Sequence, residues 1–262
     1  MPRPPRYAEL AQVWRQSGRW LPNGWVDALR QLGLVAAAYY VYRLVRGFVD
    51  GQASLAFENA RLLVDIERSI GLFFEPGLQA WAKGEEWLMF GANWMYVNSH
   101  FVVTTTFIVW LYLARNHAFY YVRNMFMVAM ALALAGYVAF PTAPPRFLPE
   151  WGFTDTVAGY FGESAEHTAG VLYNPFAAVP SMHVAFALMV AVPAFFLVKN
   201  RVLRGLWAVY PALVSFVVVV TANHYWVDAV LGAMVAAASA CAASAAFARA
   251  RPEAWAWRTA EA

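Results

Sequence analysis

Charged residues are scarce in this sequence: Asp, Glu, Lys and Arg make up 13% of its 262 residues, against about a quarter in a typical soluble domain. Hydrophobic residues make up 61%, and the mean hydropathy is +0.45. This composition is that of an integral membrane protein. The formal net charge is only +3, and we find no basic face of the kind that a nucleic-acid partner requires.

The sequence also has a single cysteine, Cys241, so an intrachain disulfide is excluded and thiols do not indicate the compartment. Residues 1–28 are polar and Arg-rich, and they lack the apolar core that follows the basic start of a cleaved signal peptide. We expect them to form a cytoplasmic N-terminal segment. No internal repeat or low-complexity linker divides the chain, so residues 1–262 are interpreted as one membrane domain.

Long apolar runs predict an all-α fold, a six-span transmembrane helical bundle. The predicted spans are residues 29–49, 87–113, 124–140, 182–198, 206–222 and 226–247. Arg43 and Arg46 near the end of the first span can extend to the membrane interface, and the sequence assigns them no further role. The proline-rich segment 141–146 cannot continue a helix, because proline lacks the amide donor.

Residues 55–74 differ from these runs because apolar and charged residues alternate with a helical period. The apolar positions are Leu62, Leu63, Ile66 and Ile70, and the charged ones are Arg61, Asp65, Glu67 and Arg68. This pattern predicts an amphipathic helix near the N-terminus that lies in the membrane interface or packs on the bundle.

The charges orient the predicted bundle. With both termini in the cytoplasm, the cytoplasmic segments contain most of the 19 basic residues but few of the 16 acidic ones, as the positive-inside rule requires. We therefore expect a plasma (inner) membrane protein whose polar motifs lie at the outer ends of their spans. Arg123 falls at the opposite, cytoplasmic end of its span, so we predict that it is not catalytic.

A histidine and an aspartate interrupt the apolar run around residues 217–240. His224 and Asp228 have i,i+4 spacing, which on a helix brings both side chains onto one face. A carboxylate that accepts the Nδ1–H of an imidazole fixes its tautomer and leaves Nε2 as a base, a nucleophile or a metal ligand. Ionisable groups at such positions are expected to face a cavity and a partner.

A second motif, residues 180–183, offers complementary groups at the start of another apolar run. Ser181 and His183 lie there, and Arg146 ends the proline-rich segment. Together with His224 and Asp228 these groups suit phosphoryl transfer, which requires fixed donors around the equatorial oxygens. His224 could attack phosphorus while His183 protonates the departing oxygen, and Arg146 and Ser181 could bind the phosphate.

The same residues carry a family resemblance. Pro180-Ser181-Met182-His183 resembles the Pro-Ser-Gly-His element of the type-2 phosphatidic acid phosphatase superfamily (the lipid phosphate phosphatases), and His224 with Asp228 resembles the end of its third motif. With the proline-rich segment 141–146, the pattern is most similar to the inositol phosphorylceramide synthase-like branch. The resemblance implies a catalytic core at about 87–245, His224 as nucleophile, Asp228 as its orienting group and His183 as general acid. It implies no metal and no cofactor.

Four positions depart from the family pattern. Ala139 stands where the first motif has a lysine, Val217 and Val218 stand where the third motif has Ser-Arg, and Met182 replaces the glycine of Pro-Ser-Gly-His. The sequence therefore offers a phosphate less positive charge than the broad phosphatase pattern does.

The expected function is cleavage or transfer of the phospho-headgroup of a lipid at the outer leaflet, through a phosphohistidine. A phosphatase acting on phosphatidate or a polyprenyl pyrophosphate is the alternative within this chemistry, and a non-catalytic transporter or scaffold is the alternative outside it. The sequence names neither the lipid, nor the acceptor (water or an alcohol), nor the oligomeric state.

Several of these residues also have other interpretations. His224 and Asp228 could be a structural pair, or could bind a metal together with His183. Arg146 could be a membrane-interface anchor, and Ser181 could cap its helix. His100, in mid-span, could be a hydrogen-bonded packing residue or could line the substrate cavity.

Overall fold

The computed structural model describes residues 21–47, 52–161 and 176–247, and every regular element within them is a helix. The N-terminal half contains α2 (Gly24–Gly47), α3 (Ala53–Ser69), α4 (Glu75–Lys83), α5 (Glu86–Ala114) and α6 (Asn116–Ala139). The rest contains η2 (Pro145–Phe147), η3 (Pro149–Trp151), α7 (Thr156–Phe161), α9 (Met182–Leu197), α10 (Arg201–Val220), α11 (Trp226–Ala242) and η4 (Ala243–Phe247). The predicted N-terminal segment lies outside the described residues up to residue 20.

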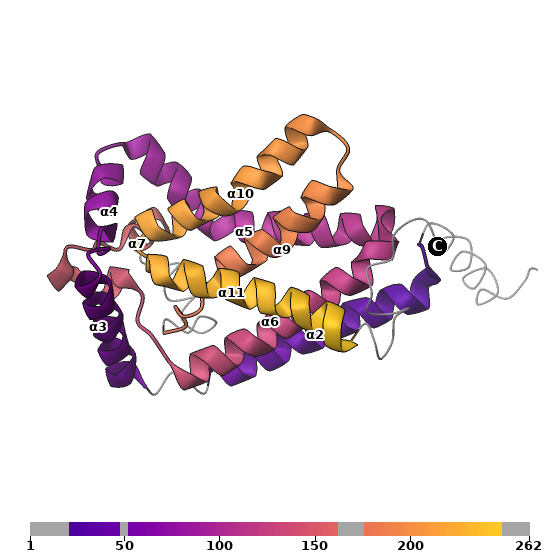
Figure 1. The fold of residues 1–262 in the computed structure, drawn as a ribbon, viewed down its shortest axis with the longest axis horizontal. Helices are drawn as coiled ribbons and strands as arrows, with labels where there is room; N and C mark the ends of the chain where they lie inside the picture. The colour runs from indigo at the N-terminus through magenta and orange to yellow at the C-terminus, as the bar shows by residue number, and fades with distance from the viewer. Residues whose placement is uncertain (1–20, 48–51, 162–175, 248–262) are drawn as a thin grey trace, which may run out of the picture.

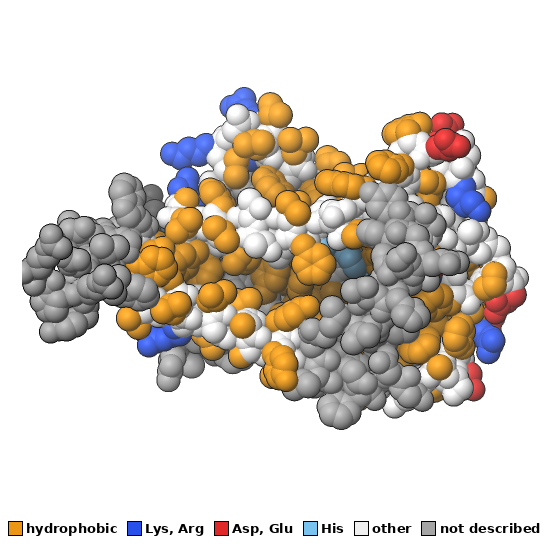
Figure 2. All heavy atoms as spheres, turned by 180° about the vertical axis from the view of Figure 1, so that it is seen from behind, with side chains coloured by type: hydrophobic (Ala, Val, Ile, Leu, Met, Phe, Trp, Pro, Cys, Tyr) orange, Lys and Arg blue, Asp and Glu red, His pale blue; other side chains and the backbone are white. Residues whose placement is uncertain are grey.

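Four helices, α5, α6, α10 and α11, are long and apolar enough to cross a membrane. They correspond to the predicted second, third, fifth and sixth spans, although α6 starts at Asn116 rather than at residue 124. Figure 2 shows charged side chains gathered toward the two ends of the molecule, with a broad apolar surface between them. An integral membrane protein is thereby confirmed.

The other two predicted spans are also helices, but they are not among these four. α9 has 16 residues, which gives a length of about 24 Å, shorter than the roughly 30 Å of membrane hydrocarbon. α2 has 24 residues and exposes Leu29, Leu32 and Tyr40. The six-span arrangement therefore remains a prediction, as do the roles of Arg43 and Arg46, whose side chains lie outside the described set.

α9 lies in the middle of the bundle, in contact with α5, α6, α10 and α11 (Figure 1). Its packing on α11 is so close that a Cβ at Gly232 would lie 2.2 Å from the Ser181 carbonyl oxygen. A glycine is therefore required at this crossing. The close approach fixes the start of α9 relative to the first turns of α11.

α3 and α4 lie across one end of the bundle, at the left of Figure 1. A helix is present over most of the predicted range 55–74, ending at Ser69, but its buried side matches the predicted apolar side only in part. Leu63 and Glu67 are buried, whereas Leu62, Ile66 and Ile70 are exposed. The reason is that α3 packs through its small residues, Ala56 and Ala60 among them, against the segments around residues 143 and 222–225. Whether α3 lies in the membrane interface remains a prediction.

At the opposite end, a polar network ties α2 to α5 and α6. Asp27 accepts hydrogen bonds from Gln31, Tyr112 and Tyr120 at 2.8–3.0 Å. The guanidinium of Arg123 donates to Gln31 and Asn124. Arg123 is therefore engaged in a structural network and not in the histidine cluster.

Candidate functional site

His224 lies in the short turn between α10 and α11. The backbone N–H groups of Asn223 and His224 both donate to the carbonyl of Val218 at 3.1 Å, which closes the end of α10. Ala222 has a positive φ of 52°, and this bend reverses the chain within five residues, so the two helices are neighbours. The turn itself is buried.

His224 and Asp228 lie in contact, as their spacing predicts: His224 Nδ1 is 3.4 Å from Asp228 Oδ2. The contact does not arise on one helix face, because α11 begins only at Trp226. Asp228 instead folds back on the helix start and also accepts the Tyr225 N–H at 3.1 Å. The carboxylate thus orients the imidazole and caps the helix at once. Asp228 is fully buried, where an unpaired carboxylate would be costly.

The second motif meets the first at this point. The ring centroids of His183 and His224 are 5.6 Å apart, in an edge-to-face arrangement. The Ser181 N–H donates to the Asp228 backbone carbonyl at 3.1 Å, so α9 and α11 are joined beside the two histidines. Two motifs some forty residues apart in the sequence therefore form one cluster.

Ser181 is at the N-cap position of α9, but its side chain makes no capping hydrogen bond. Ser181 therefore occupies the N-cap position without capping the helix through its side chain. Its hydroxyl oxygen is buried and has no hydrogen-bond partner among the described residues. A buried hydroxyl without a partner is uncommon in native proteins, and this one lies one residue from the α9 N-terminus and two residues from His183.

Arg146 lies against the turn that carries His224. Its backbone N–H donates to the Ala222 carbonyl at 2.8 Å, and its guanidinium donates to the Asn223 side-chain oxygen. Its Nε also lies 3.2 Å from Asp155 Oδ2, and the Arg146 side chain is only 8% exposed. A side chain so enclosed does not anchor the protein at the membrane interface, so that interpretation of Arg146 is wrong.

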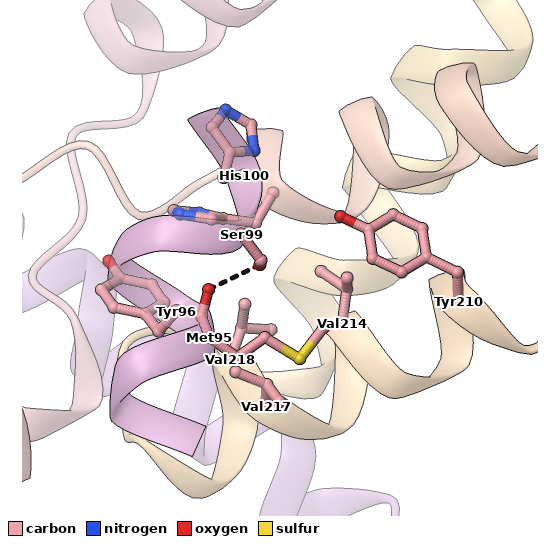
Figure 3. A pocket seen from close by; sticks show the side chains of 9 residues that line it. Met95, Tyr96, Ser99, His100, Tyr210, Val214, Val217 and Val218 are labelled. Carbon is pink, nitrogen blue, oxygen red and sulfur yellow. Dashed lines mark hydrogen bonds between the residues drawn. The ribbon is translucent and has the colours of Figure 1, made fainter. Parts of the chain in front are cut away.

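A small pocket lies on the other side of His183, between α5 and α10. Figure 3 shows Tyr96, Ser99 and His100 of α5 facing Tyr210 and three valines of α10 across it. The His183 ring stacks on Tyr96 at 4.6 Å and lies 4.8 Å from the His100 ring. The volume that the centre of a water molecule can occupy in this pocket is about 10 Å³. This leaves room for about one water.

His100 therefore lines this pocket, and it packs through ring contacts rather than through hydrogen bonds within the described segments. Val217 and Val218, which replace Ser-Arg of the family pattern, line the same pocket. This wall of the site is therefore apolar. Figure 2 shows a small patch of histidine atoms in a hollow of the surface.

Sequence reasoning missed four polar residues around the site. Asn223 and Asp155 hold the Arg146 guanidinium, and Glu67 and Glu75 are buried against the start of α11. The position of Asn223 beside His224 was a usable signal. No comparable signal marked Glu67 or Glu75, since both precede His224 by about 150 residues.

Among the described residues, no three His, Cys, Asp or Glu side chains form a group that could hold a metal ion. His183, His224 and Asp228 are therefore not grouped as metal ligands in this part of the chain.

Comparison with protein families gives a match. The sequence model described as the PAP2 superfamily matches residues 61–242. Searches among curated proteins and among solved structures give no match. The matched range contains all of the clustered side chains described above. It begins earlier than the catalytic core expected at about 87–245, so it includes most of α3 and all of α4.

Proposed function

The chain belongs to the PAP2 superfamily, and from this premise we propose that it cleaves or transfers the phospho-headgroup of a membrane lipid. Members of this superfamily are generally phosphatases. The observation that carries the proposal is the meeting of His183 and His224 at 5.6 Å, with Asp228 on the Nδ1 side of His224. A purely structural pair of His224 and Asp228 would not require a second histidine, His183, beside it.

In the proposed reaction, His224 Nε2 attacks phosphorus and the bond from phosphorus to the lipid oxygen breaks. His183 gives its proton to that departing oxygen. Water or an alcohol, deprotonated by His183, then attacks the phosphohistidine and releases His224. Asp228 supports both steps because a buried carboxylate at 3.4 Å stabilises the positive charge on the His224 ring.

Arg146 and Ser181 are the proposed phosphate ligands. Asn223 and Asp155 orient the guanidinium beside the His224 turn, so its planar fork is arranged before substrate arrives. The Ser181 hydroxyl, which has no hydrogen-bond partner in the described part of the chain, and the N–H groups at the start of α9 add neutral donors. Among the described residues that line the pocket at Val217 and Val218, none is an arginine or a lysine.

This limited charge is why we propose a phosphotransferase of the inositol phosphorylceramide synthase-like kind ahead of a phosphatase for simple monoesters. A transferred phosphodiester headgroup carries less negative charge than a monoester, and it requires fewer cations. We further propose that the site opens to the outer leaflet of the plasma (inner) membrane, with both termini in the cytoplasm. No cofactor is part of this scheme.

The test is to trap the intermediate. The full chain, purified in detergent, is incubated with a panel of lipids radiolabelled at phosphorus, with and without a lipid alcohol as acceptor. Acid-labile label on the protein is expected in the wild type and not in His224→Ala, and Asp228→Asn should lower turnover about 10⁴-fold while folding normally. His117→Ala, remote in sequence from both motifs, serves as the control.

Label retained by His224→Ala would refute the assignment of the nucleophile. Absence of label and of turnover with every lipid would favour the transporter or scaffold alternative. Release of inorganic phosphate from a lipid monoester, without transfer to the alcohol, would favour the phosphatase.

A further inference from the structure

Two buried carboxyl groups lie behind the His224 turn and have no part in the proposed chemistry. Glu67 is in the last turn of α3 and Glu75 is the first residue of α4, and both are fully buried. The connection between the two helices reverses at Gly71, whose φ is +72°, and the Leu72 N–H donates to the Glu67 carbonyl at 2.8 Å. The two carboxyl groups on either side of this reversal lie within hydrogen-bonding reach of each other.

The connection holds the first residue of α11. Glu75 Oε1 accepts the Trp226 backbone N–H at 3.2 Å, and Glu75 Oε2 accepts the Phe74 N–H at 2.9 Å. The Trp226 indole N–H donates to the Leu72 carbonyl at 3.0 Å. Two carboxylates therefore accept the N–H groups at the start of α11. Asp228, within the helix, accepts the N–H of the N-cap residue Tyr225, and Glu75 of α4 accepts the N–H of Trp226. Negative charge at a helix N-terminus is stabilising.

Glu67 lacks such donors. Within the segments that the structure describes, neither of its oxygens receives a hydrogen bond from an N–H or O–H group, and no lysine or arginine forms an ion pair with it. The nearby cation, Arg68, instead lies over the rings of Phe73 and Trp151. An ionised carboxylate in this position would be strongly disfavoured.

The groups that face Glu67 add to this effect. Burial first, and then the charge of Glu75 in α4 and that of Asp228 in α11, raise the pKa of Glu67 to about 9. The backbone N–H of Val227 favours the ionised form although it forms no full hydrogen bond with Glu67, and it is the smallest of these influences. A neutral Glu67 is a donor, and the carboxyl group within its reach is Glu75.

We propose that Glu67 and Glu75 share one proton, and that this carboxyl pair is a positioning element for the His224–Asp228 pair at the start of α11. Glu67 donates to Glu75, and Glu75 holds the Trp226 N–H two residues before Asp228. Neither glutamate touches the substrate. The positioning role rests on the proposed function, whereas the shared proton does not.

The shared proton makes the stability of the folded protein depend on pH. An unfolded glutamate has a pKa near 4.5, whereas the folded value is about 9. Between these values the folded protein holds a proton that the unfolded chain lacks, so stability falls as the pH rises through this window. When Glu67 loses its proton, a second negative charge appears beside Glu75 and Asp228, and the start of α11 is displaced.

The experiment compares wild type with Glu67→Gln, which is neutral and still offers a donor to Glu75. The control is Asp65→Asn, an exposed carboxylate of the same helix. The melting temperature and kcat of the detergent-purified full chain are measured from pH 6 to about pH 10. We expect both to fall on the alkaline side in wild type and in Asp65→Asn, and to fall much less in Glu67→Gln.

Equal alkaline loss of melting temperature in Glu67→Gln and wild type would overturn the shared proton. If Glu67→Gln makes the melting temperature less dependent on pH but leaves the pH dependence of kcat as in wild type, the positioning role is overturned. If no lipid is turned over by any variant, the proposed function fails while the melting profiles still decide the shared proton. If Glu67→Gln does not fold, the infrared band of a protonated carboxylic acid in wild type at pH 8 decides it, and its absence refutes the pair.

Discussion

Replacing Gly232 by alanine tests how tightly the crossing of α9 and α11 controls the site. A Cβ there would lie 2.2 Å from the Ser181 carbonyl oxygen and 3.1 Å from the Ser181 carbonyl carbon. Both are backbone atoms, so no side-chain rotation relieves the overlap. Since non-bonded heavy atoms of this kind are comfortable at about 3.5 Å, the two helices must separate locally by about 1 Å.

Gly232→Ala should lower stability through overpacking and should lower the rate through displacement of the site residues. Overpacking of this size costs about 1–3 kcal/mol, against a gain of about 0.5–1 kcal/mol expected for replacing a glycine by alanine inside a helix. The displaced backbone carries the Ser181 N–H that donates to the Asp228 carbonyl at 3.1 Å, and His183 follows two residues later. A displacement of 1 Å at reacting groups costs about 100-fold in rate.

The assay measures kcat and the melting temperature of Gly232→Ala with the best lipid from the labelled panel. Gly205→Ala is the matched control, because Gly205 lies in α10 and a Cβ there meets nothing within 4 Å. The control should melt at or above the wild-type temperature with unchanged kcat, whereas Gly232→Ala should melt lower and lose about 100-fold in kcat. Wild-type kcat in Gly232→Ala would refute the claim that this contact sets the geometry of the site.

Two further predictions concern the phosphate ligand and the topology. Arg146→Lys should lower kcat/KM about 10- to 100-fold, because a lysine cannot reach both Asn223 and Asp155 and one charge-assisted hydrogen bond is worth about 1.5–3 kcal/mol; an unchanged value would place the phosphate elsewhere. In a background where Cys241 is replaced by serine, a cysteine at the exposed Ala114 should react only with a membrane-permeant reagent, and one at the exposed Glu150 also with an impermeant reagent in intact cells. The reverse pattern would move the site to the cytoplasmic leaflet.

The clustering of the two motifs could be predicted from the sequence because its signal is local. His183 and His224 each stand at the edge of an apolar run, and ionisable side chains in such places require partners. The i,i+4 spacing of His224 and Asp228 predicted their contact, although the contact depends on a helix start rather than on a helix face. The i,i+4 rule therefore predicted the correct pair of residues but not the backbone geometry that joins them.

The environment of Glu67 could not be predicted in the same way. An alternating apolar and charged pattern shows which residues share a helix face, but not which face packs on the rest of the protein. α3 buries the face with Ala56 and Ala60, because small residues allow close packing against the segment around residue 143. Glu67 lies on that face, and its partners come from α4 and α11, which no local rule connects with α3.

The length of α9 also affects how a lipid substrate reaches the two histidines. In the six-span arrangement that we predict, a helix of 16 residues is about 6 Å too short for an average hydrocarbon layer. With Leu197 at the inner boundary, Ser181 and His183 lie below the level of the outer headgroups. Either the bilayer thins around α9 or the phosphate of the substrate descends to meet the histidines. Hydrophobic mismatch would then act on catalysis, so that the thickness of the surrounding membrane, set by acyl-chain length, becomes a determinant of turnover in its own right.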